Sequence, residues 1–240
     1  MPRAETSPPR IGGRRLLVVV IGWLAVSALL VVATGFTARA GWPAPAPRAR
    51  RGDLGALYML EAYLVLVVAM AAGFGGVRGL AHRLGFHFTS WRDLTLAPVL
   101  WLAALIVGGL LTALLAPLLG HGPSNSVALF GRARDPLFLA LTVGTVVLLG
   151  PAAEEMLFRG ALFGWLRGRT PAAAAAAISA ATFAAAHLLP AAFPFLFVFG
   201  IAAAIMYERT GSTLNSFAMH ACQNAFAVVV TLGLLGGHVG

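Results

Sequence analysis

Long apolar runs dominate the chain, and short stretches rich in Arg, Pro and Gly separate them. A helix needs about 20 apolar residues to cross the roughly 30 Å hydrocarbon core of a bilayer. Runs of about that length predict an all-α fold, a polytopic transmembrane helix bundle of about seven spans. The expected spans are residues 16–36, 54–77, 94–119, 135–165, 171–190 and 193–206, and a last one that starts within 210–215.

Several of these spans begin with a recognisable local signal. Asp135 and Thr170 are each followed by proline, so we expect each to cap a helix whose first position is the proline. Pro98 lies in the first turns of its span, where a missing N–H is tolerated. The run from Leu16 exceeds the roughly 7–15 residues of a signal-peptide core, which favours an uncleaved anchor.

Polar stretches divide the chain into three parts. Residues 1–53 comprise an N-terminal arm, a first membrane anchor and a Pro- and Arg-rich linker that we expect to be extended from residue 39. Residues 54–134 hold two spans joined by an Arg/His loop at 78–93. Residues 135–240 form a helix bundle, and most of the informative polar residues lie there.

The composition supports a membrane protein and excludes other classes. The 240 residues are 59% hydrophobic and only 10% charged, far from the values of soluble domains. The net charge is +9, and all 17 basic residues are Arg, mostly near the ends of apolar runs. This pattern suits lipid headgroups and lacks the basic face of a nucleic-acid-binding protein. The single Cys222 excludes an intrachain disulfide. We therefore expect a multi-pass protein of the cell membrane.

Two glutamates and an arginine interrupt the fourth span. An ionisable side chain at membrane depth costs at least about 2.5–3.5 kcal/mol, so it usually faces the bundle interior and has a function. Glu155 and Arg159 are four residues apart and can neutralise each other on one helix face. Glu154 points about 100° away from Glu155 and lacks that partner. Glu154 is therefore the group expected to do chemistry.

Three further polar residues stand on later spans. His187 lies four residues after Phe183, whose ring can wall one side of the imidazole, and His220 and Asn224 project together one turn apart. A carboxylate, two imidazoles and an amide around one cavity are what water activation and oxyanion stabilisation require. Taken singly, the glutamates could reach water at the membrane surface, and the other groups could be interhelical hydrogen-bond donors.

These residues form motifs that resemble those of the CPBP family, the CAAX proteases and bacteriocin-processing enzymes, also called Abi proteins. EEMLFR at 154–159 is similar to the family motif EExxxR, FAAAH at 183–187 to FxxxH, and HACQN at 220–224 to HxxxN. The resemblance covers about residues 135–235, which it marks as a CPBP-like catalytic bundle. It implies an intramembrane endopeptidase that cleaves a peptide or a lipid-anchored or membrane protein.

The resemblance also implies roles for the motif residues. The first glutamate acts as general base with the help of the FxxxH histidine, and the histidine and asparagine of the last motif bind the oxyanion. The second glutamate and the arginine hold the site together. The general base is thus Glu154 and its helper His187. The oxyanion ligands are His220 and Asn224, and the pair that holds the site together is Glu155 and Arg159.

The sequence leaves two questions open: whether the chemistry needs a metal ion, and whether the protein is an enzyme. Family members have been called metalloproteases, but the sequence has no H-E-x-x-H, and a catalytic zinc site needs three protein ligands plus an open position. We favour metal-independent chemistry and keep as the alternative a divalent metal, such as zinc, held by Glu154, His187 and His220. A scaffold or bacteriocin self-immunity protein would carry the same motifs without catalysis. A proton-coupled transporter is disfavoured because no inverted repeat is visible.

Overall fold

The structure is a computed structural model that describes residues 12–40, 48–120 and 136–236. All regular structure in these ranges is helical and no strand occurs in them, which confirms the all-α fold class. The elements are α1 (Gly13–Ala40), α2 (Arg48–Phe74), α3 (Gly76–Arg83), α4 (Trp91–Leu94), α5 (Leu96–Leu119), α7 (Pro136–Gly144), η1 (Thr145–Leu149), α8 (Gly150–Glu155), η2 (Met156–Phe163), α9 (Gly164–Arg167), α10 (Ala172–Ala186), η3 (Pro190–Ala192), α11 (Phe193–Thr210) and α12 (Thr213–Gly236).

Five segments within the described residues are long and apolar enough to cross a membrane. They are Gly13–Leu30, Leu57–Phe74, Trp91–Leu119, Pro136–Arg167 and Pro190–Thr210. The remaining two predicted spans correspond to α10 and α12. Helix α10 has only 15 residues, fewer than the roughly 20 that a span needs, and polar residues interrupt α12.

The outer surface of the bundle is apolar where a soluble protein would be polar. On α5, Leu110, Leu114 and Leu118 are 68%, 73% and 81% exposed. On α12, Val229 is 70% exposed. Apolar exposure of this kind along whole helices is typical of a surface that contacts lipid.

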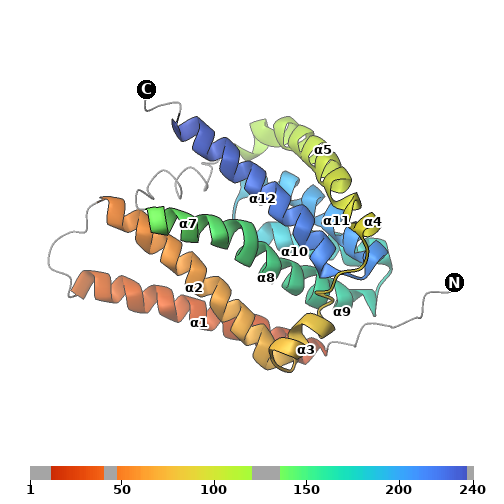
Figure 1. The fold of residues 1–240 in the computed structure, drawn as a ribbon, viewed down its shortest axis with the longest axis horizontal. Helices are drawn as coiled ribbons and strands as arrows, with labels where there is room; N and C mark the ends of the chain where they lie inside the picture. The colour runs from red at the N-terminus through yellow and green to blue at the C-terminus, as the bar shows by residue number, and fades with distance from the viewer. Residues whose placement is uncertain (1–11, 41–47, 121–135, 237–240) are drawn as a thin grey trace.

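The segment Pro136–Arg167 runs through the middle of the bundle. It passes between α2 and α12, while α1 lies against α2 on the outside (Figure 1). On the other side, α10 packs against η2 and α11, and α11 packs against α5. The central segment therefore carries its two glutamates to a place that α2, α10, α11 and α12 all surround.

The sequence predicts one continuous helix over 135–165. The structure differs, because this central segment is not a uniform α-helix. Two π-helical stretches, η1 and η2, flank the short α-helix α8. The N–H of Gly150 donates to the carbonyl of Thr145, five residues earlier. The next residue in this register is Pro151, which has no N–H, so the carbonyl of Val146 lacks its π-helical donor. Such a carbonyl needs a partner from elsewhere in the protein.

Other local predictions are partly wrong. Helix α2 begins at Arg48, so residues 48–53 are helical, which fits the high helix propensity of Arg and Ala. Residues 41–47 of the expected linker lie outside the described residues. Much of the expected loop at 78–93 is helical as well, because α3 and α4 form there. The stretches that prove helical hold charged residues and no proline, and charge by itself does not prevent a helix.

Proline stands at the start of two helices as expected, although the cap of α10 differs from the prediction. Helix α7 begins at Pro136, while Asp135 lies outside the described residues. At α10 the N-cap is Pro171 itself. The hydroxyl of Thr170 donates instead to the carbonyl of Leu166, at 3.0 Å. Pro98 lies in the first turn of α5, as expected.

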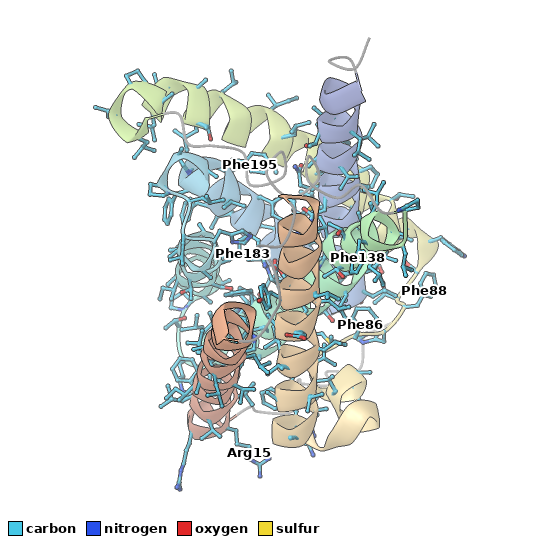
Figure 2. The ribbon with its side chains drawn as sticks, turned by 90° about the vertical axis from the view of Figure 1, so that its left-hand side faces the viewer. Arg15, Phe86, Phe88, Phe138, Phe183 and Phe195 are labelled. Atoms are coloured by element: carbon cyan, nitrogen blue, oxygen red, sulfur yellow. The ribbon has the colours of Figure 1, made fainter. Side chains whose placement is uncertain are left out.

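Glycines allow α11 to pack closely between α10 and α5. A Cβ on Gly200 of α11 would lie 2.8 Å from the Cβ of Ala180 on α10. A Cβ on Gly108 of α5 would lie 2.9 Å from a ring atom of Phe195, which Figure 2 shows on the face of α11 toward α5. Small residues at helix contacts are how membrane helices approach one another. This packing fixes the position of α11 beside the glutamates.

We expect Gly200→Ala to lower the free energy of unfolding by about 1–3 kcal/mol, because the added methyl group has no room. Gly109→Ala on α5 is the matched control, since nothing lies within 4 Å of a Cβ there. It should be neutral or slightly stabilising because Ala favours the helix. Thermal unfolding in detergent measures both variants. Equal midpoints would contradict the close packing of α10 and α11.

Candidate active site

A buried ion pair lies at the centre of the bundle. Arg159 Nη1 donates to Glu155 Oε1 at 3.0 Å, and both side chains are 0% exposed. This confirms the predicted pairing of the two residues. Arg159 Nη2 donates to the carbonyl of Gly200 on α11 at 3.2 Å. The guanidinium also lies 4.6 Å from the ring centroid of Phe183 on α10, a cation–π contact. Arg159 thus joins the central segment to α10 and α11.

His220 brings α12 to the same carboxylate. Its Nδ1 lies 3.0 Å from Glu155 Oε1. Because a carboxylate paired with arginine can only accept, Nδ1 carries the proton. When the ring is neutral, Nε2 is then an acceptor, and it lies 3.8 Å from Glu154 Oε2. The structure therefore brings the two glutamates of the first motif and the histidine of the last motif together, as expected from the sequence.

Glu154 differs from Glu155 in exposure and in partner. Its side chain is 14% exposed, whereas that of Glu155 is fully buried. Its Oε1 accepts a hydrogen bond from the hydroxyl of Tyr63 on α2, 91 positions earlier in the chain. The expectation that Glu154 has no partner is therefore wrong. Solvent access remains the property that separates it from Glu155.

Tyr63 is the residue that the sequence analysis missed. It lies inside an apolar span without belonging to any motif. The one available signal was chemical, since a tyrosine hydroxyl buried among apolar residues usually finds a hydrogen-bond partner. That signal predicts that a partner exists and leaves its identity open.

His187 lies just beyond the end of α10. Its Nδ1 is 2.8 Å from the carbonyl of Phe183, so Nδ1 donates and Nε2 of the neutral ring is a free acceptor. Its ring packs against Phe183 with centroids 4.7 Å apart, which confirms the predicted wall. The ring of His220 contacts the same phenylalanine at 5.7 Å, and Figure 2 shows Phe183 in the interior of the bundle. No hydrogen bond or ion pair joins His187 to Glu154, two residues that the structure describes.

Asn224 binds the carbonyl that proline leaves without a donor. Its Nδ2 donates to the carbonyl of Val146 in η1 at 2.8 Å. Val146 is the residue whose π-helical donor would be Pro151. The amide thus acts as an interhelical donor, the simpler explanation that the sequence left open. One N–H of the amide remains for a second hydrogen bond.

The described residues contain no group of three or more His, Cys, Asp or Glu side chains placed to hold a metal ion. Glu154 and His220 adjoin each other, but His187 does not form a ligand group with them. A catalytic zinc site needs three protein ligands. The set proposed for the metal alternative therefore does not fit that ion in this arrangement.

The part of the chain that carries the motif residues matches a known protein family. Residues 136–226 match the family described as Type II CAAX prenyl endopeptidase Rce1-like. This segment belongs to the CPBP family. The Rce1-like segment contains every motif residue, from Glu154 to Asn224, whereas α2 with Tyr63 lies outside it. No curated protein and no solved structure matches the chain.

Within the Rce1-like segment, we expect Arg159→Leu to lower the free energy of unfolding by about 3–5 kcal/mol, because it leaves a buried carboxylate without its cation. Adding Glu155→Gln should recover part of this loss. Denaturant unfolding in micelles measures both variants.

The matched control is Arg167→Leu, which breaks an ion pair with Glu208. The side chains of Arg167 and Glu208 are 40% and 37% exposed. Exposed pairs contribute only about 0–1 kcal/mol. If Arg159→Leu were as mild as Arg167→Leu, the buried pair would not be a structural requirement.

Proposed function

We propose that the protein is an intramembrane endopeptidase of the cell membrane that cleaves a peptide or a membrane-associated protein. The Rce1-like match and the candidate membrane spans support this class of activity. The observation that carries the proposal is the contact between Glu154 and His220. A partly exposed carboxylate stands 3.8 Å from an imidazole nitrogen inside the helix bundle, beside the buried ion pair.

This contact suits the activation of a water molecule. Glu154 Oε2 and His220 Nε2 are both acceptors, and at 3.8 Å they are too far apart for a direct hydrogen bond. A water about 2.8 Å from each atom could donate one hydrogen to each. Glu154 would take a proton as this water attacks the scissile carbonyl, and would then give it to the leaving amine.

The buried ion pair would keep His220 ready for this step. Glu155 Oε1 holds the proton on Nδ1, and Arg159 holds Glu155 in place. The tautomer and the orientation of the ring are then both determined before substrate binds. We propose that Glu155 and Arg159 act only through His220, without touching the substrate.

His187 and Asn224 would contribute at the edge of this centre. The free Nε2 of His187 is an acceptor suited to help with proton transfer. The remaining amide N–H of Asn224 is a donor suited to the developing oxyanion. The geometry supports His220 more strongly than His187 as the direct partner of Glu154, which differs from the role that the family resemblance implied.

We also propose that α10 and α12 lie in the bilayer beside the five candidate spans. Both pack along the other helices of the bundle. All seven predicted spans would then be present. The glutamates would lie at membrane depth, where a membrane-associated substrate can reach them.

The test is cleavage of a panel of membrane-anchored peptides by the purified protein, with and without a chelator. We expect Glu154→Gln to reduce the rate by about 10²–10⁴-fold, the usual contribution of a general base. His220→Ala and His187→Ala should each reduce it too, with the larger effect for His220. Glu208→Gln, which removes an exposed carboxylate, is the control.

Each alternative has its own outcome. A wild-type protein that binds peptides but cuts none would favour the scaffold or self-immunity function and would refute the protease proposal. Equal rates for Glu154→Gln and wild type would refute Glu154 as the base. Loss of activity with the chelator would restore the metal alternative.

A further inference from the structure

We infer that Tyr63 is a positioning residue of this active site, supplied by a helix that lies outside the Rce1-like segment. The inference rests on the proposed protease function. It assigns to α2 a part in catalysis, namely to hold the carboxylate of Glu154 in the orientation that presents Oε2 to His220.

The contact between Tyr63 and the site has two parts. The hydroxyl donates to Glu154 Oε1. The ring lies against the backbone one turn earlier, where a Cβ on Gly150 would be 3.0 Å from Tyr63 Cζ. A side chain at position 150 would press against the ring, which would have to move by a few tenths of an ångström. The tyrosine thus contacts α8 near its first residue and binds the glutamate near its end.

The hydrogen bond makes the two oxygens of Glu154 unequal. The terminal torsion of a glutamate is broad, so a free carboxylate turns easily between orientations. With Oε1 held by Tyr63, Oε2 is the oxygen that faces His220 Nε2. A base held in one orientation places its lone pair toward the reacting water without a further loss of entropy.

The α1–α2 hairpin keeps Tyr63 in place. Trp23 Nε1 on α1 donates to the carbonyl of Ala62, next to Tyr63, at 2.9 Å. On α2, which carries Tyr63, Leu66 and Met70 are 1% and 0% exposed. The hairpin is therefore firmly packed where it meets the central segment. By supplying Tyr63, the hairpin would complete a site whose other residues all come from the Rce1-like segment.

The first test compares Tyr63→Phe with Tyr58→Phe, the same chemical change on the same helix. We expect Tyr63→Phe to lower kcat by about 10- to 100-fold, since small misplacements of catalytic groups have effects of this size. KM should stay within about twofold because substrate contacts are unchanged. Tyr58→Phe should alter neither constant. A normal kcat for Tyr63→Phe, or a change confined to KM, would overturn the inference while leaving the proposed function intact.

The second test does not depend on activity. Thermal unfolding midpoints are measured for Tyr63→Phe in the wild-type and in the Glu154→Ala background. If the hydroxyl holds Glu154, the downward shift should be larger in the wild-type background, because the partner is missing in the other. Equal shifts would overturn the inference. If the wild type cuts no peptide, the proposed function fails, and this comparison alone decides whether Tyr63 holds Glu154.

Discussion

The buried ion pair between Glu155 and Arg159 is the interaction on which the rest of the site depends. Two charges removed from water are costly unless their remaining hydrogen-bonding capacity is met by the protein. Arg159 meets part of it with the carbonyl of Gly200 and the face of Phe183. Glu155 meets part of it with His220. Since these partners stand on α10, α11 and α12, satisfying one ion pair brings the surrounding helices to defined positions.

The irregular backbone of the central segment also leaves a polar group that a neighbouring helix must satisfy. Pro151 and the π-helical register leave the carbonyl of Val146 in need of a donor, and Asn224 from α12 provides it. A backbone carbonyl that loses its donor inside a bundle of apolar helices must find a partner on a neighbouring helix or water. Irregularity and interhelical contact therefore occur together, and the π-helical stretches flank the short helix that carries the glutamates. Such stretches are frequent at functional sites.

The errors of the sequence analysis have physical causes. Residues 48–53 fall within the predicted extended linker, yet arginine and alanine continue α2 there. The predicted bounds of the fifth span, 171–190, are too wide, because Pro171 and the turn at His187 limit α10 to 15 residues. A helical wheel shows only neighbours three or four positions away, so the sequence leaves Glu154 unpaired. Tyr63 is a neighbour only in the folded bundle.

The sequence by itself determined the helical class, the approximate extent of the long helices, the pairing of Glu155 with Arg159 and the motif residues. These follow from apolar run length, proline positions and i,i+4 spacing, which all act within one helix. Only the tertiary structure decided that His220 lies beside both glutamates and that Tyr63 reaches Glu154. Those contacts join helices far apart in the chain, and their geometry depends on how glycines and one buried ion pair let the helices pack.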